Sequence, residues 1–303
     1  MTGTALPSPT MEPCGICASN TRGPRSRRSY SPAGDTAIIA LHGAATGTKD
    51  SFLYKHLHDV LPQAGIGVVT FDRRGEGAST GDSSRGRLDM QVGDALAVLE
   101  AVDAERVGLW GFSQGGWVAP LAAVASDRVA FLVLLASTGV TPSERMMYAT
   151  AEQLRRGGYD AAIVRRALAL RRAFEDWVHG RERERESGLK AELSSGLEDV
   201  VAARVPAAES ARRRGTAALD RGDGLRSKPV LEQVRVPTLL VYGEDDAWTP
   251  VGPSVEAWRQ AGRDDVEIVL VPEATHELTL PDGTLASKYE RTLVDWLVRR
   301  SRS

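Results

Sequence analysis

A serine between closely spaced glycines is the first feature of this 303-residue chain that could carry chemistry. Ser113 lies in the stretch GFSQG, Gly111 to Gly115, between the apolar run RVGLWG and a segment with helical spacing. A tight strand-to-helix turn exposes the serine hydroxyl, and glycines on both sides avoid side-chain clashes. The first amides of the following helix point toward that hydroxyl and can stabilise an oxyanion. We predict that Ser113 is a nucleophile that attacks a carbonyl carbon.

A serine hydroxyl is a poor nucleophile unless a base removes its proton and a carboxylate orients that base. The sites of parallel sheets form where the strands end, so the segments that follow strands are the ones to consider. Of the five histidines, His276 is the one that follows a predicted strand downstream of a carboxylate. Asp245 and Asp246 follow the strand before it. His276 is therefore the predicted base, and either aspartate is a candidate for the orienting acid.

The second half of an oxyanion-binding site should come from a loop after an early strand. The stretch IIALHGAATG supplies such a loop, in which Gly43 and Ala44 are small enough to run close to the serine. We predict that the backbone N–H groups of Ala44 and Gln114 hold the oxyanion. His42, at the start of the same loop, is interpreted as a structural hydrogen-bonding residue in preference to a base.

These residues need a scaffold, and the pattern of the chain from Asp35 onward indicates one. Short apolar runs alternate with amphipathic segments of helical spacing, which predicts an α/β fold with a mostly parallel sheet and helices on both faces. The runs that predict buried strands cover residues 36–41, 66–71, 106–111, 129–136, 237–243 and 266–271.

The alternation of apolar runs and amphipathic segments divides the chain into three predicted regions. Residues 1–33 are rich in Pro, Ser, Gly and Arg and are predicted to form a partly flexible arm. Residues 34–140 and 231–303 form the predicted core. Residues 141–230 contain helical signals and no convincing strand, so they are predicted to be a helical cap or lid inserted after the fourth strand of the core.

Candidate pocket residues come from that insertion and from the loops of the core. Met146, Met147 and Trp177 would give the insertion an apolar underside, while Phe112 and Trp248 neighbour the predicted nucleophile and acid. They suggest a pocket for a largely apolar acyl or alcohol group. Core packing is the favoured interpretation of each one taken singly.

Composition narrows the partners that we expect. The chain is 42% hydrophobic and 26% charged with a formal net charge of −2, which gives no reason to expect nucleic acid or an anionic membrane surface. Its apolar runs are too short to span a bilayer, and the N-terminus lacks the apolar region of a secretory signal. A cytoplasmic protein that acts on a small-molecule acyl substrate, as a monomer or homodimer, is the expectation.

The two cysteines, Cys14 and Cys17, have the spacing of a redox pair or of half a zinc site. A redox pair normally lies between a strand and a helix, and a zinc site needs two further ligands nearby. Neither feature is found around these cysteines, so we interpret them as incidental thiols. With no other cysteine, a fold built on disulfides is excluded. We expect no metal and no cofactor, because metal-ligand clusters and dinucleotide motifs are also missing from the sequence.

Four motifs, in order and spacing, resemble those of the α/β-hydrolase superfamily: LHG, FDRRGEGAST, GFSQGG and YGEDDAWTP with THEL after it. The resemblance covers everything but the arm, which lacks a clear opening pair of strands, and looks closest to the bacterial serine-aminopeptidase and dienelactone-hydrolase-like groups. It implies the chain order Ser, Asp, His for the triad. The acid loop of the family, laid on Gly243 to Pro250, places the acid at Asp246 and leaves Asp245 as the alternative. The segment Asp72 to Ser79 would then shape the floor of the site.

The residues and the resemblance together predict a serine hydrolase that cleaves a carboxylic ester or thioester through an acyl-enzyme intermediate. One alternative is an aminopeptidase or amidase, which would need an acidic cluster under the lid, with Glu175, Asp176 and the glutamates of 181–186 as candidates. Another is a cyclase or lyase that uses the same site without hydrolysis, or a binding protein with a silent triad. A serine at this position argues against the dehalogenases and epoxide hydrolases of the superfamily, which use aspartate.

Overall fold

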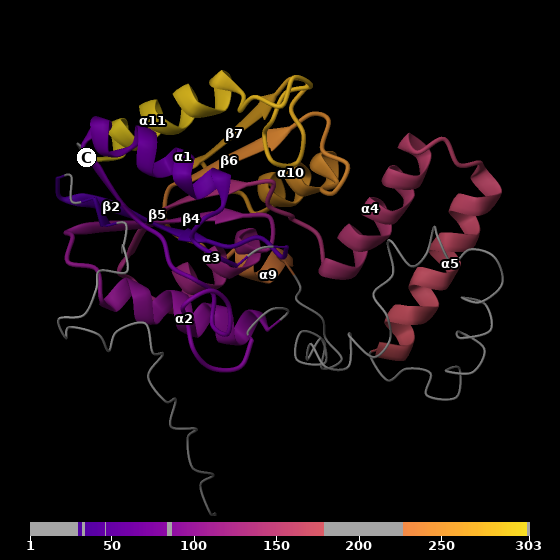
Figure 1. The fold of residues 1–303 in the computed structure, drawn as a ribbon, viewed down its shortest axis with the longest axis horizontal. Helices are drawn as coiled ribbons and strands as arrows, with labels where there is room; N and C mark the ends of the chain where they lie inside the picture. Colours follow the sequence, from indigo (N-terminus) through magenta and orange to yellow (C-terminus); the bar gives the residue numbers. More distant parts are fainter. Residues whose placement is uncertain (1–29, 32–33, 46, 84–86, 179–226, 302–303) are drawn as a thin grey trace, which may run out of the picture.

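The computed structural model describes residues 30–31, 34–45, 47–83, 87–178 and 227–301 (Figure 1). Most of the predicted arm, with Cys14 and Cys17, lies outside this range, and so do residues 179–226 of the predicted insertion. The described part of the chain forms one sheet with helices on both of its faces (Figure 1).

The sheet has seven strands and is mostly parallel, which confirms the predicted fold class. The strand order is β1-β3-β2-β4-β5-β6-β7, and the β1–β3 pair alone is antiparallel. β4, which leads into the predicted nucleophile, lies in the middle of that order. The strands are β1 (Tyr30–Ser31), β2 (Thr36–Leu41), β3 (Ile66–Val69), β4 (Arg106–Phe112), β5 (Val129–Leu135), β6 (Thr238–Gly243) and β7 (Val266–Val271).

Residues of the central strands alternate between two apolar cores, one on each face of the sheet. In β2, Ile39 belongs to the first core and Ile38 to the second, and all six positions of the strand are buried. Burial on both faces explains why β2 is a continuous apolar run. The first core is covered by α2 (Leu88–Glu100), α3 (Gly115–Ala125), α9 (Ser227–Leu231) and α10 (Val251–Gln260), and the second by α1 (Phe52–Val60), the short η1 (Pro62–Ala64) and α11 (Ser287–Ser301).

Two helices leave the core after β5 and lie beside each other, away from the sheet (Figure 1). α4 (Pro142–Arg156) begins at a capping box, in which the Thr141 and Glu144 side chains each accept a hydrogen bond from the other's backbone N–H. α5 (Ala161–Val178) packs on α4 through a small apolar cluster that contains Leu154 and Val164.

The edges of the predicted regions shift slightly in the structure. β1 pairs with β3, so the sheet already begins in the segment predicted as the arm. The strand predicted over 66–71 ends at Val69. The boundary predicted at 230/231 falls inside α9, whose Leu231 is buried in the first core.

Candidate active site

Ser113 occupies a strained turn between β4 and α3. Its φ is 52°, a left-handed conformation that a residue other than glycine adopts at a cost. The turn is also crowded: a Cβ at Gly111 would lie 2.5 Å from the carbonyl oxygen of Gly115, and a Cβ at Gly115 would lie 2.6 Å from that of Leu41. The glycines therefore answer a steric requirement, because no side chain fits where the helix backbone passes so close to the strands.

The structure brings three of the predicted site residues into one hydrogen-bonded chain. The Ser113 hydroxyl lies 2.9 Å from Nε2 of His276, and Nδ1 of His276 lies 2.8 Å from Oδ2 of Asp246. The three residues come from the turn after β4 and from the loops after β7 and β6, so they meet at the carboxyl ends of parallel strands of one sheet. This arrangement can pass the serine proton to an imidazole whose tautomer a carboxylate holds.

The environment of Asp246 favours its ionised form. The carboxylate is buried, which by itself raises its pKa, but hydrogen bonds from His276 and from the N–H groups of Trp248 and Thr249 outweigh burial and hold the pKa below its usual value. The two N–H groups lie 2.7 and 2.9 Å from Oδ1, so the other oxygen stays available to His276. The neighbouring Asp245 is exposed, and its carbonyl accepts a hydrogen bond from Arg156.

The loop after β2 lies against the nucleophile, as the prediction for Ala44 requires. A Cβ at Gly43 would lie 3.6 Å from Cβ of Ser113 and only 2.9 Å from the Phe112 ring. Arg73, which is fully buried, donates a hydrogen bond to the carbonyl of Gly43. Because the N–H and C=O groups of a trans peptide point in opposite directions, this bond turns the N–H of Ala44 away from Arg73. The sequence analysis did not single out Arg73, whose contact with this loop the structure shows.

The two remaining residues of this neighbourhood have plain structural partners. The Gln114 side chain accepts a hydrogen bond from Nε2 of Gln91 at 3.2 Å. Nε2 of His42 lies 2.7 Å from the carbonyl of Phe71. Burial, helped by the nearby cation of Arg73, lowers the pKa of His42 to about 4 and keeps the ring neutral.

A cation that the sequence analysis did not single out lies directly on the nucleophile. Nη2 of Arg145, from the first turn of α4, donates to the Ser113 hydroxyl at 2.8 Å and lies 3.4 Å from Nε2 of His276. The side chain is buried, and its guanidinium stacks over the ring of Trp117 at 5.5 Å. A sequence signal existed: Arg145 lies one helical turn before Ala149, so a charge occupies the stripe that α4 buries.

The predicted pocket residues reach the site to different degrees. The rings of Phe112 and Trp248 lie 5.1 and 6.3 Å from the His276 ring, and Trp248 remains partly exposed. Met146 and Met147 follow Arg145 on α4 and are half-buried. The side chain of Trp177 lies outside the described part of the structure.

α4 is tied to the acid loop from its middle and from its C-terminal end. The Tyr148 hydroxyl donates to the backbone carbonyl of Asp246 at 3.2 Å, and Arg156 donates to that of Asp245 at 2.8 Å. Together with the bond from Arg145 to the serine, these contacts fix the helix over the triad.

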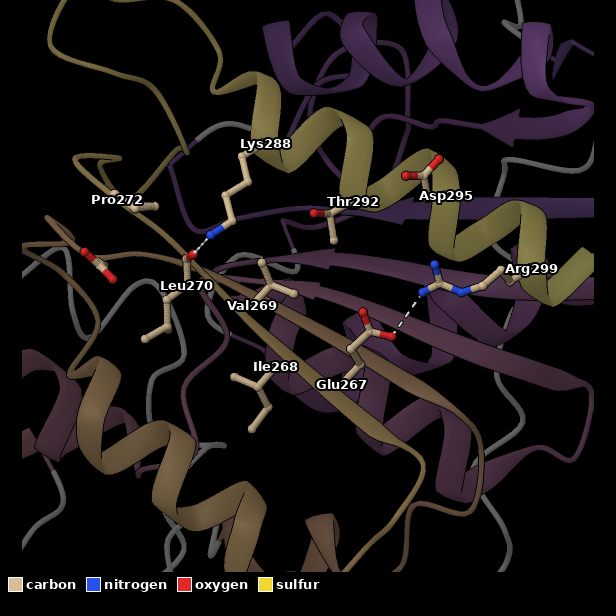
Figure 2. Close-up of a pocket in the computed structure, with 10 residues that line it drawn as sticks. Glu267, Ile268, Val269, Leu270, Pro272, Lys288, Thr292, Asp295 and Arg299 are labelled. Carbon is tan, nitrogen blue, oxygen red and sulfur yellow. Dashed lines mark hydrogen bonds and ion pairs between the residues drawn. The ribbon is translucent and has the colours of Figure 1, made fainter.

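A separate hollow of about 590 Å³ lies between β7 and α11, away from the triad (Figure 2). Three of its charged groups have partners: Lys288 donates to the carbonyl of Leu270 at 2.8 Å, and Arg299 pairs with Glu267 at 3.2 Å (Figure 2). None of Ser113, Asp246 and His276 lines this hollow.

The described residues show neither a group of metal ligands nor a membrane-spanning helix. They contain no group of three or more His, Cys, Asp or Glu side chains placed to hold a metal ion. Among the helices that the structure describes, none is both long and apolar enough to cross a membrane.

Comparison with known proteins identifies the family of this chain and structures with a similar fold. A family model described as serine aminopeptidase, S33, matches residues 33–281. Among solved structures, a monoacylglycerol lipase from Paleococcus ferrophilus is similar with a TM-score of 0.58 at 20% sequence identity, over 90% of this chain and 98% of that one. At this identity the similarity establishes the fold and nothing finer.

Two curated relatives are similar in sequence. The dihydrolipoyllysine-residue acetyltransferase component of an acetoin cleaving system from Pseudomonas putida is 28% identical over 248 residues, which cover 80% of this chain and 59% of that protein. A 2-hydroxy-6-oxononadienedioate/2-hydroxy-6-oxononatrienedioate hydrolase from Paraburkholderia xenovorans is 26% identical over 275 residues, 88% of this chain and 89% of that protein. This chain thus spans less than two thirds of the first relative, whose activity as a whole does not carry over.

Proposed function

This chain belongs to the serine aminopeptidase (S33) family of α/β-hydrolases, and from that premise we propose that it hydrolyses an ester or thioester of a small to medium acyl compound with Ser113 as nucleophile. The observation that carries the proposal is the pair of hydrogen bonds from Ser113 to His276 and from His276 to Asp246, at 2.9 and 2.8 Å. Nucleophile, base and orienting acid are already within reach of one another before any substrate binds.

The proposed reaction has two halves. Ser113 attacks the carbonyl carbon while His276 takes its proton, and the N–H groups of Ala44 and Gln114 stabilise the negative oxygen. His276 then protonates the leaving alcohol or thiol, which departs and leaves an acyl-enzyme. In the second half His276 deprotonates a water molecule that attacks the acyl carbon, and the carboxylic acid is released as Ser113 regains its proton.

The charges around the serine support an ester or thioester over a peptide with a free amino terminus. An aminopeptidase needs a carboxylate to bind the substrate ammonium group, but the group on Ser113 is the cation of Arg145. Glu175, one candidate for an acidic cluster, is paired with Arg171 at 2.7 Å and accepts a hydrogen bond from Ser143. The side chain of Asp176 and residues 181–186 lie outside the described range.

Covalent labelling tests the proposal. A fluorophosphonate probe should label the folded protein at Ser113, and p-nitrophenyl esters of graded length should be turned over with an acyl-enzyme visible by mass spectrometry after rapid quenching. Ser113→Ala should abolish both signals. Ser126→Ala, at the far end of α3, is the matched control and should keep both.

The outcomes separate the alternatives. Folded protein that is not labelled at Ser113 would contradict the proposed mechanism. Labelling together with cleavage of aminoacyl anilides, but not of esters, would indicate the aminopeptidase. Labelling with neither reaction and no acyl-enzyme would favour a cyclase or lyase at the same site.

A further inference from the structure

Arg145 is a buried cation whose charge has no carboxylate partner in the described part of the molecule. Its side chain is only 6% exposed, and the carboxylate whose charge acts on it, Asp246, is paired with His276 and forms no ion pair with Arg145. Burial lowers its pKa to about 10, so the guanidinium still carries its charge near neutral pH. A buried charge without a counter-ion is costly, and proteins normally compensate it.

The contacts that Arg145 does make leave much of its hydrogen-bonding capacity unused. Nη2 bonds to Ser113, and the guanidinium stacks on Trp117, but Nε is buried with no hydrogen-bond partner among the described residues. A guanidinium offers five N–H donors in a planar fork that matches two carboxylate oxygens. The hydrogen bond from Nη2 places this guanidinium beside the Ser113 hydroxyl, which would attack the substrate.

The positive charge of Arg145 also disfavours proton transfer from Ser113 to His276 when no anion neutralises it. His276 becomes positively charged when it takes the serine proton, and Nη2 of Arg145 lies 3.4 Å from the nitrogen that receives it. Two like charges at that distance repel each other strongly in a site screened from water. An anion bound to Arg145 would remove this repulsion and draw the guanidinium away from the serine oxygen.

We propose that Arg145 binds a free carboxylate of the substrate, so that the preferred substrates are monoesters or monothioesters of short dicarboxylic acids. This inference rests on the proposed hydrolysis at Ser113 and names its substrate class. Because one guanidinium nitrogen is 2.8 Å from the attacking oxygen, the carboxylate must lie about two to four bonds from the reacting carbonyl. Water cleaves the acyl bond, and the products are the dicarboxylic acid and the alcohol or thiol.

Aromatic side chains near His276 suit the alcohol or thiol portion of such a substrate. The rings of Phe112 and Trp248 lie 5.1 and 6.3 Å from the ring of His276, the group that would protonate the leaving alcohol or thiol. An apolar alcohol or thiol portion would pack there, while the carboxylate is bound by α4.

A binding measurement tests the inference without relying on turnover. Monomethyl malonate, succinate and glutarate, and the corresponding neutral dimethyl esters, are titrated by calorimetry into the full-length Ser113→Ala protein. We expect one of the monoesters to bind at least tenfold more tightly than its dimethyl counterpart. Adding Arg145→Gln should abolish that difference, Arg145→Lys should restore part of it, and Arg155→Gln, an exposed arginine of the same helix, should leave it intact.

Turnover gives the second readout. The protein that retains Ser113 should hydrolyse the preferred monoester with a kcat/KM at least tenfold above that for the dimethyl ester. Arg145→Gln should bring this ratio to about one. Equal binding of both esters to Ser113→Ala overturns the inference, whatever the rates. The inference is also overturned if Arg145→Gln lowers kcat/KM equally for both esters, because Arg145 would then stabilise the transition state and would not recognise the carboxylate. Neither result touches the proposed function, which is tested separately by labelling of Ser113 and by turnover of neutral p-nitrophenyl esters.

Discussion

Oδ2 of Asp246 lies 2.8 Å from Nδ1 of His276, while its other carboxylate oxygen accepts two backbone N–H groups. One carboxylate therefore both orients the imidazole and stays fixed to its own loop. Asp245, one residue earlier, is exposed and does not take part.

This relationship predicts opposite outcomes for two neighbouring substitutions. Asp246→Asn should lower kcat by about 10⁴-fold, because the amide cannot hold the tautomer that accepts the serine proton. Asp245→Asn should stay within about twofold of the starting protein, since surface substitutions rarely matter. Steady-state kinetics on a p-nitrophenyl ester measures both. The reverse pattern would move the acid to Asp245.

The oxyanion-binding loop gives a test of Arg73. Arg73→Met removes the donor that holds the Gly43 carbonyl, so the N–H of Ala44 loses its orientation and kcat should fall by about 10- to 100-fold with little change in KM. Arg128→Gln is the matched control, because Arg128 also donates to a backbone carbonyl, that of Val102, far from the site.

The melting temperature of each variant separates orientation from folding. A fall in kcat for Arg73→Met that merely follows the folded fraction would refute the positioning role. A fall in the folded protein, partly restored in Arg73→Lys, would support it.

The buried, neutral His42 predicts a pH dependence of stability. In the unfolded chain it takes up a proton near its ordinary pKa of 6.5, but in the fold it stays neutral down to a pKa of about 4. Between these values the unfolded state binds more protons, so the free energy of unfolding falls as pH falls, by up to about 1.4 kcal/mol per pH unit. His42→Gln keeps an N–H for Phe71 and does not titrate. Urea unfolding from pH 7 to 4 should show a shallower loss for this variant, and parallel curves would contradict the prediction.

The turn around the nucleophile predicts a contrast between two glycines. Gly111→Ala forces a Cβ to within 2.5 Å of a backbone oxygen and should lower the free energy of unfolding by about 3 kcal/mol or more. Gly252→Ala, in α10, meets nothing within 4 Å and should raise it by up to about 1 kcal/mol through helix propensity. Chemical denaturation of both variants makes the comparison, and equal effects would show that crowding at the turn is not what selects glycine.

The sequence by itself determined the fold class and the order of the reactive residues. Apolar runs such as 36–41 are buried on both faces, and a parallel sheet is the structure that buries a strand in that way. Glycines around Ser113 mark a turn that no other residue fits. His276 and Asp246 could be predicted because the ends of parallel strands meet at one edge of a sheet, so position after a strand already implies proximity.

Tertiary structure alone decided how the two arginines act. Arg73 and Arg145 lie in segments that a sequence pattern assigns to a turn and to the first turn of a charged helix. The spacing of Arg145 and Ala149 places Arg145 on the buried stripe of that helix, but it does not identify Ser113 as its partner. Their roles depend on partners 30 and 32 residues away, the Gly43 carbonyl and the Ser113 hydroxyl. A long, flexible side chain can point to solvent or into a site, and only the packing of α4 and the loops against the sheet fixes which.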